Sequence, residues 1–179
     1  MYNGKNKTAL LSQKLITEAF LTLLEKNKLS KVTVSEICKK AGVSRQTFYS
    51  LFKSKENLIN YEYNRRNIQL YDYFNDKENV KMEDIIVAFS SFLFDNKKFF
   101  KILVENDMLC LINDAIQINL ASYNNFLPKN EDLKNAYALS FISGGLTEIT
   151  RIYILNENPP KLELIESFLI DLFNGNYLL

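Results

Sequence analysis

The sequence predicts an all-α protein with about nine helices. Glycine and proline, which mark most tight turns, occur only five and three times in 179 residues, too rarely for a fold rich in sheets. Apolar residues recur at the spacing of helix faces, and short polar joints separate these stretches. With 47% hydrophobic and 24% charged residues, the composition is that of a folded globular chain.

The first helix is expected within residues 9–26. Apolar side chains repeat there at intervals of three and four residues, so they share one face of a helix. They are Ile16, Ala19, Phe20, Leu23 and Leu24.

A second helix is predicted to begin after Thr33. The hydroxyl of Thr33 stands three residues before the carboxylate of Glu36, which is the spacing of a capping box. This helix would carry Ile37 and Ala41 on its inner face. We expect it to be short, because Gly42 follows and is the residue best able to adopt a positive φ.

A third helix is predicted over Arg45–Leu51, with Ser44 as its cap. Two short helices joined by a turn of three or four residues that contains glycine are typical of a helix-turn-helix motif. A generic helical hairpin shares this spacing. It does not, however, require the basic residues and hydroxyl groups that surround this pair.

The remaining helices are predicted from apolar periodicity between polar or proline-containing joints. The long helix near the C-terminus contains Gly144 and Gly145, each of which costs about 1 kcal/mol relative to alanine. A close approach by another backbone or by a ligand would compensate; a simple kink is the alternative. The predicted ranges are 55–74 for a connector, then Met82–Asp95, 99–105, 109–125, 131–156 and Leu162–Phe173.

Charge is distributed unevenly along the chain. Residues 1–54 hold ten basic and three acidic side chains, a net charge of +7, whereas the other 125 residues hold 12 basic and 18 acidic ones, a net charge of −6. A basic end on an acidic body suits a chain that meets a polyanion at that end. The alternative is that these lysines are ordinary solvated surface residues. Charge alone does not distinguish the two interpretations, so the motifs are needed to choose between them.

Several functions are made unlikely by composition. The chain has no histidine, so it cannot build Ser-His-Asp or Cys-His catalysis or an imidazole metal site. Cys38 and Cys110 lack CxxC spacing and suit a reducing compartment. No apolar run approaches the roughly 18 residues of a membrane span, and the polar start resembles no signal peptide. We expect a cytoplasmic protein that is not an enzyme and has no cofactor, metal or membrane partner.

The segment of residues 16–59 closely resembles the N-terminal DNA-binding domain of the TetR family of bacterial transcriptional regulators. The resemblance implies a three-helix helix-turn-helix domain, a connector helix, and a C-terminal helical bundle for effector binding and dimerisation. We expect the first domain to be residues 1–54 and the second to be residues 55–179. The matching pieces are Ala19-Phe20, TVSEI at 33–37, AGVS at 41–44 and TFYxxFxSKExL at 47–58.

Double-stranded DNA is therefore the expected partner, bound by the exposed face of the third helix. Arg45 and Gln46 are the expected base readers, because forked side chains bond guanine or adenine edges with two hydrogen bonds. Thr47 and Tyr49 resemble the family's phosphate-contacting positions. The other expected contacts are Ser50; Lys55 at a helix N-terminus; Thr33, which would share its hydroxyl between capping and DNA; and Ser44, which alternatively serves only as a cap.

Two apolar residues, Phe48 and Leu51, lie close to this face in the sequence. Phe48 is expected in the core, together with Phe52, and not on DNA. The family commonly has histidine where this chain has Leu51, which would remove a polar group facing DNA. This departure leaves open a TetR-like coactivator or scaffold without autonomous DNA binding, as the alternative to a homodimeric repressor on a palindromic operator.

The C-terminal part is rich in aromatic residues. Four of them, Phe89, Phe92, Tyr123 and Phe141, are expected to line an apolar pocket for an unidentified small-molecule effector. Core packing is the alternative for each. The last two helices are expected to pair with their symmetry mates in a homodimer, through Phe141, Ile149, Ile152, Leu164, Phe168 and Leu172.

Overall fold

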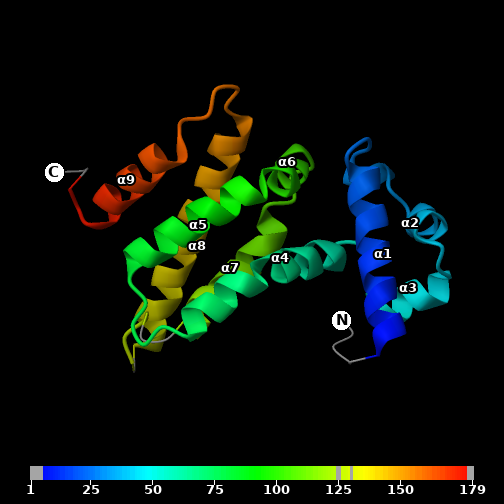
Figure 1. Cartoon of the computed structure of the whole chain (residues 1–179), viewed down its shortest axis with the longest axis horizontal. Helices are drawn as coiled ribbons and strands as arrows, with labels where there is room; N and C mark the ends of the chain where they lie inside the picture. The colour runs from blue at the N-terminus through cyan, green and yellow to red at the C-terminus, as the bar shows by residue number, and fades with distance from the viewer. Residues whose placement is uncertain (1–5, 124–125, 130, 177–179) are drawn as a thin grey trace. The chain divides into compact units, whose positions relative to one another are not determined.

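The computed structural model describes residues 6–123, 126–129 and 131–176. This part of the chain contains nine α-helices, one short 3-10 helix and no strand, which confirms the predicted all-α class (Figure 1). The helices are α1 (Lys7–Leu24), α2 (Val34–Ala41), α3 (Arg45–Leu51), α4 (Asn57–Asn75), α5 (Met82–Asp95), α6 (Lys97–Glu105), α7 (Cys110–Ser122), α8 (Asp132–Leu155) and α9 (Leu162–Phe173), with the 3-10 helix η1 (Leu29–Lys31) before α2.

The chain forms two compact units, Met1–Arg65 and Arg66–Leu179, which we call the head and the body. Helix α4 contributes residues to both. The predicted ranges of α3, α5 and α9 agree with the structure. Helix α4 begins at Asn57, two residues later than predicted, and α8 is helical throughout, including its two glycines. Helix α7 ends at Ser122; its predicted end at residue 125 lies outside the described residues.

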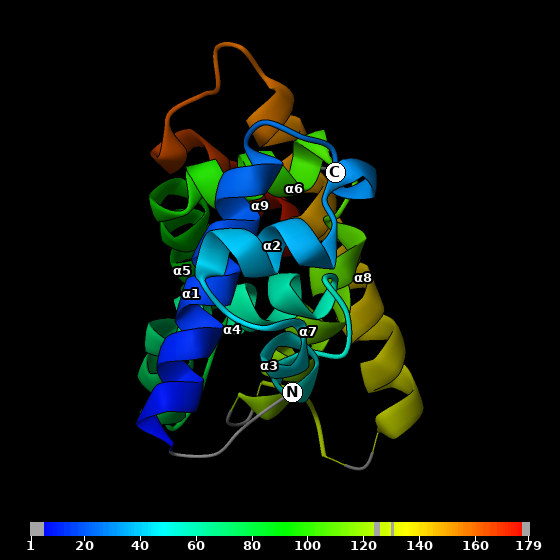
Figure 2. The ribbon, with the colours of Figure 1, turned by 90° about the vertical axis from the view of Figure 1, so that its right-hand side faces the viewer.

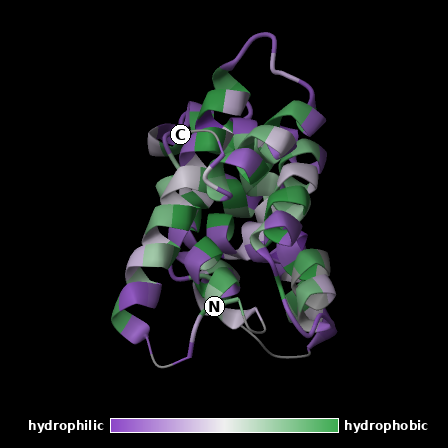
Figure 3. Ribbon diagram, turned by 90° about the vertical axis from the view of Figure 1, so that its left-hand side faces the viewer, coloured by the Kyte–Doolittle hydropathy of each residue, from purple (hydrophilic) through white to green (hydrophobic). Residues whose placement is uncertain are grey.

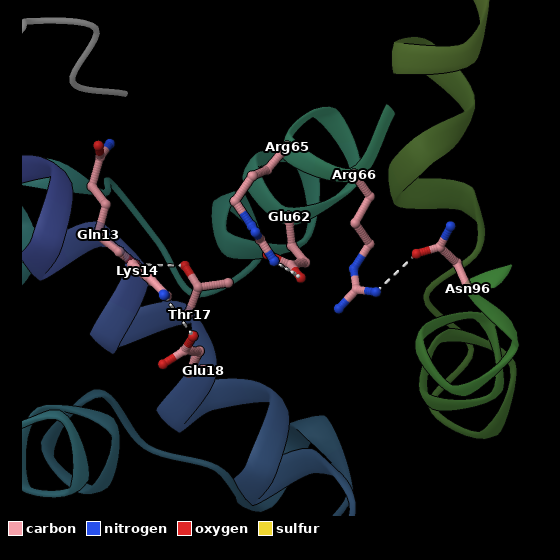
Figure 4. A network of polar contacts seen from close by, with 8 residues as sticks. All are labelled: Gln13, Lys14, Thr17, Glu18, Glu62, Arg65, Arg66 and Asn96. Atoms are coloured by element: carbon pink, nitrogen blue, oxygen red, sulfur yellow. Dashed lines mark hydrogen bonds and ion pairs between the residues drawn. The ribbon is translucent and has the colours of Figure 1, made fainter. Parts of the chain in front are cut away.

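In the head, α1, α2 and α3 pack against one another (Figure 2). Their shared core contains the apolar residues that the helical spacing predicted. Those with 0 or 1% exposure are Ile16, Phe20, Ile37, Phe48 and Phe52, and Leu58 and Ile59 of α4 are equally buried. The interior also holds a carboxylate, Glu62 of α4, whose oxygens accept bonds from Arg65 Nε at 2.8 Å and Arg65 Nη2 at 2.9 Å (Figure 4). This pairing compensates for its burial.

The turn between α2 and α3 follows local sequence signals. Thr33 and Glu36 form the predicted capping box at the start of α2. Gly42 ends α2 in the left-handed conformation, with φ 68°, which an L side chain adopts at a cost. Ser44 then caps α3 by accepting a bond from Thr47 N at 3.0 Å. The helix-turn-helix geometry is thus set by residues close in sequence.

In the body, α5 packs on α9, and α6 and α7 pack on α8. Hydrophobic and hydrophilic residues alternate along these helices (Figure 3). The ring centroids of Phe74 and Tyr123 lie 4.4 Å apart, and Arg66 lies over the ring of Phe99. Arg66 Nη1 also donates to Asn96 Oδ1 at 2.8 Å (Figure 4). None of the helices in the described part of the chain combines the length and apolar composition needed to span a bilayer.

Candidate nucleic-acid interface

Helix α3 separates its residues into a buried and an exposed side. Phe48 and Leu51 are buried, at 0 and 5% exposure. The opposite side exposes most of the residues expected to contact DNA: Ser44, Arg45, Gln46, Tyr49 and Ser50, with Thr47 half-buried among them. Tyr49 is 51% exposed, and its ring meets that of Phe48 edge-on, with centroids 5.3 Å apart. One short helix therefore presents six of the eight predicted residues together.

The hydroxyl groups of Ser44, Thr47 and Ser50 form hydrogen bonds along this side. Ser44 Oγ lies 2.9 Å from Thr47 Oγ1, and Ser50 Oγ donates to the carbonyl of Thr47 at 2.8 Å. One hydrogen is shared between the Ser44 and Thr47 hydroxyls, so the other remains available for an acceptor such as a phosphate oxygen. Capping by Ser44 is therefore compatible with a DNA contact.

Arg45 and Gln46 occupy the first turn of α3 and are both exposed. Neither side chain forms a hydrogen bond or an ion pair with another described residue. Their donors and acceptors are therefore not used within the described fold. Because recognition helices present their N-terminal residues to base edges in the major groove, this placement suits the two predicted base readers.

Thr33 is more constrained. Its hydroxyl donates to Glu36 Oε2 at 2.7 Å and accepts from Glu36 N at 3.2 Å, while Thr33 N donates to Glu36 Oε2 at 2.8 Å. The bond from Thr33 N–H, followed by that from its hydroxyl, holds the pKa of the Glu36 carboxyl below its usual value. The hydroxyl hydrogen is thus engaged by Glu36, and only an acceptor position remains open.

Lys55 has an internal role that its sequence position did not reveal. It precedes the first residue of α4 by two positions, and its Nζ donates to the carbonyls of Leu29 at 2.6 Å and Val32 at 3.0 Å. These carbonyls belong to η1 and its C-cap. An ammonium group has three donors, so one remains for a phosphate.

We expect Lys55→Ala to lower the free energy of unfolding of the head by about 2 kcal/mol, because hydrogen bonds from a charged donor contribute about 1.5–3 kcal/mol each and the site is half-buried. Urea denaturation followed by circular dichroism measures this loss. Lys53→Ala is the matched control, because Lys53 is exposed and has no bonded partner among the described residues. Equal stability of the two variants would contradict the internal role of Lys55.

Other cations near the motif were not singled out from the sequence. Lys39 and Lys40 are exposed in the last turn of α2, next to Cys38, whose thiol lies 3.8 Å from the carbonyl of Ser44. Burial raises the pKa of this thiol, so Cys38 behaves as a core residue. The sequence feature that could have indicated these two lysines is the net positive charge of residues 1–54. A net charge, however, does not identify individual side chains.

Comparison with known proteins identifies this architecture. Residues 16–61 match the family described as bacterial regulatory proteins, tetR family. This segment of the chain is a TetR-family DNA-binding domain. It is 26% identical over 182 residues to the HTH-type dhaKLM operon transcriptional activator DhaS of Lactococcus lactis subsp. lactis (strain IL1403), a match that covers 93% of this chain and 90% of that protein.

Solved structures share the fold. A TetR transcriptional regulator from Streptococcus agalactiae 2603V is 21% identical, with a TM-score of 0.59 over 94% of this chain and 96% of that chain. Lin0861 from Listeria innocua is 11% identical, with a TM-score of 0.79 over 98% of this chain and 96% of that chain. With its TetR-type DNA-binding helix-turn-helix, the chain is similar to transcriptional regulators over nearly its whole length.

The position that departs from the TetR pattern faces the core. Leu51 is 5% exposed on the buried side of α3, so the expectation that this substitution removes a group facing DNA is wrong. The side chain packs inward because it lies three residues after Phe48 on the same helix face. The departure thus gives no reason to doubt DNA binding by this TetR-family head.

The four residues expected to line an effector pocket differ in their surroundings. Phe92 is buried with its ring 5.7 Å from that of Phe100, Tyr123 is buried against Phe74, and Phe89 is half-buried. Phe141, in contrast, is 75% exposed on α8. In the single chain Phe141 therefore lies on the surface, because the neighbouring helices cover a different face of α8, and its place in an apolar effector pocket stays a prediction.

A groove of about 380 Å³ lies between α4 and α5 in the body. Its walls are mostly apolar, with two carboxylates among them. None of the four predicted pocket residues contributes to it. It is lined by Leu70, Tyr73, Glu83, Asp84, Val87, Ala88 and Ser91.

Proposed function

We propose that this TetR-family regulator works as a homodimer in the bacterial cytoplasm and binds a roughly palindromic operator through the exposed side of α3. The observation that carries this proposal is the pair Arg45 and Gln46, whose exposed side chains in the first turn of α3 bond no other residue in the described part of the chain. The hydroxyl groups of Ser44, Thr47 and Ser50, together with Tyr49, Thr33 and Lys55, would position the head on the phosphate backbone.

The two expected contact types are separable by mutation. Arg45→Ala and Gln46→Ala should each relax the preference at particular base pairs by about 1–3 kcal/mol, because each removes a base-edge contact. Tyr49→Phe, which removes one phosphate donor, should weaken binding on all sequences alike. Fluorescence anisotropy on an operator series with single base-pair changes measures both effects.

The salt dependence of DNA binding tests whether the basic head contacts phosphates. Binding by a head with a charge of +7 should weaken steeply as salt rises. If Arg45→Ala and Gln46→Ala both keep the wild-type base preference, these residues are not the readers. If the wild-type protein shows no salt-sensitive binding to any DNA, the proposal fails, and the coactivator or scaffold alternative is favoured.

The homodimer is supported by the outer surfaces of the last two helices. Four of the six residues expected in the interface are exposed in the single chain: Phe141 at 75%, Ile152 at 56%, Leu164 at 62% and Phe168 at 37%. Ile149 and Leu172 are half-buried. Large apolar side chains exposed together commonly mark an interaction site. A two-fold dimer would place two α3 helices on successive major grooves.

The sign of regulation separates two versions of the proposal. Repression relieved by an effector is the version that the sequence led us to expect, whereas the relative DhaS is named as an activator. Transcription from an operator-linked reporter, with and without this protein, decides between them. A fall in transcription supports the repressor, and a rise supports the activator.

The effector proposal concerns the body, where Phe89, Phe92 and Tyr123 remain candidates for an apolar site. An effector that weakens operator binding must, by reciprocity, bind more weakly when operator is saturating, and by the same factor. We expect a factor of about ten to a hundred, equivalent to about 1.4–2.7 kcal/mol. Calorimetric titration of a candidate compound with and without operator tests this. Equal affinities would show that the compound does not regulate DNA binding.

A further inference from the structure

The groove between α4 and α5 is built from one face of each helix. Its volume of about 380 Å³ is within the range of about 300–1,000 Å³ that is typical of small-molecule sites. Leu70 and Tyr73, three residues apart, form the wall on α4. The wall on α5 consists of residues that recur every three or four positions and so share one side of the helix. They are Glu83, Asp84, Val87, Ala88 and Ser91.

The middle of the groove is apolar, and its two ends on α5 are polar. Val87 is 45% exposed and Tyr73 is 50% exposed, so each leaves a large apolar side chain partly uncovered. Glu83 and Ser91 lie eight residues apart, which corresponds to about 12 Å along a helix. The groove therefore suits a small molecule with an apolar body and a polar group at one end.

An ammonium group of the chain itself already binds at this lining. Lys77 Nζ lies 2.7 Å from Asp84 Oδ1 and 4.7 Å from the ring centroid of Tyr73. A carboxylate beside an aromatic face attracts cations. The bond from Lys77, followed by that from the backbone N–H of Lys81, holds the pKa of the Asp84 carboxyl below its usual value. The charge of Asp84 is thus compensated within the chain.

The carboxylate of Glu83 has different surroundings. It is half-buried in the groove lining and bonds no other residue in the described part of the chain. Both charged residues of the lining are acidic, and residues 55–179 as a whole carry a net charge of −6. Beside apolar surface, a charge is screened less than in open water. The groove therefore favours a cationic occupant over a neutral or an anionic one.

We propose that this groove binds a small organic cation with an apolar body, with the ammonium group at Glu83 and the apolar part against Tyr73 and Val87. The site is separate from the aromatic residues considered above for an effector, because none of them lines the groove. The inference goes beyond the proposed DNA binding and does not depend on it.

Three probes of similar shape and different charge test this occupant: 4-phenylbutylamine, 4-phenylbutanol and 4-phenylbutyrate. Calorimetric titration of the full-length protein at neutral pH, without DNA, gives their dissociation constants. We expect the amine to bind at least about tenfold more tightly than the alcohol, because hydrogen bonds between charged groups are stronger than those between neutral groups. The carboxylate probe should bind most weakly, because Glu83 repels it.

Two substitutions with matched controls locate the site. Glu83→Gln should reduce the affinity of the amine to that of the alcohol and leave the alcohol unchanged. Glu163→Gln should change neither, because Glu163 is likewise the second residue of its helix but lies outside the groove. Val87→Ser should weaken the amine and the alcohol alike, by about fivefold, because it removes apolar contact area. Ile118→Ser, at an exposed position on α7, is its control.

The tenfold preference for the amine, its loss in Glu83→Gln and the uniform weakening in Val87→Ser would together establish the site. Equal affinities of the amine and the alcohol, or a preference that survives Glu83→Gln, would show that Glu83 recognises no cation and would overturn the proposal. Binding that Val87→Ser leaves unchanged would place the probes elsewhere and would also overturn it. The same holds if none of the probes binds at millimolar concentration. Each of these failures leaves the proposed operator binding intact, because the titrations contain no DNA.

Discussion

Replacing Phe141 by Glu should convert the protein to monomers and lower its affinity for a full operator about 100-fold or more. Phe141 is 75% exposed in the single chain, so the substitution leaves the protomer's core untouched. In the proposed dimer the same position is covered, so the substitution would bury two unpaired carboxylates in the interface, at a high desolvation cost. A monomer then loses the gain that comes from binding two half-sites at once.

Light scattering coupled to gel filtration measures the mass, and anisotropy on full-length and half-site DNA measures the affinity. We expect half-site binding to be nearly unchanged, because α3 is in the other unit of the chain. Ile118→Glu is the control, since Ile118 is 69% exposed on α7 and lies outside the two terminal helices. A Phe141→Glu protein that remains dimeric and binds the full operator normally would contradict the proposed interface.

Replacing Phe48 by Ala should lower the free energy of unfolding of the head by about 3–5 kcal/mol, the usual cost of removing a buried aromatic side chain. Phe48 is 0% exposed, and its ring lies 6.0 Å from that of Phe52. Domains are stable by only about 5–15 kcal/mol, and small ones lie low in this range. The loss should therefore leave much of the head unfolded near 37 °C and abolish DNA binding.

Thermal melting by circular dichroism should show an early transition for Phe48→Ala, while the helical signal of the body persists to higher temperature. Phe94→Ala is the matched control, because Phe94 undergoes the same chemical change but is 58% exposed on α5. We expect little change in stability or DNA binding from it. Similar melting curves for the two variants would contradict the central place of Phe48 in the head's core.

The helix-turn-helix could be predicted from the sequence because its signals act between near neighbours. The capping box joins Thr33 to Glu36, the cap of α3 joins Ser44 to Thr47, and Gly42 fits a positive φ by its own chemistry. The apolar spacing also placed Phe48 correctly in the core. Exposure of Arg45 and Gln46 followed from the same helical period.

Contacts between distant segments could not be predicted in this way. Lys55 bonds carbonyls 26 and 23 residues earlier in the chain, and no local pattern announces such a partner. An aromatic residue in a pocket and one on an exposed helix face also give the same periodic signal, so the sequence could not show that Phe141 is exposed on α8. Which face of α8 is covered depends on how α6 and α7 pack against it. The sequence by itself determined the helices and the helix-turn-helix motif. Only tertiary packing decided which helix faces are buried and which remain open to a partner, because burial depends on contacts between residues far apart in the chain.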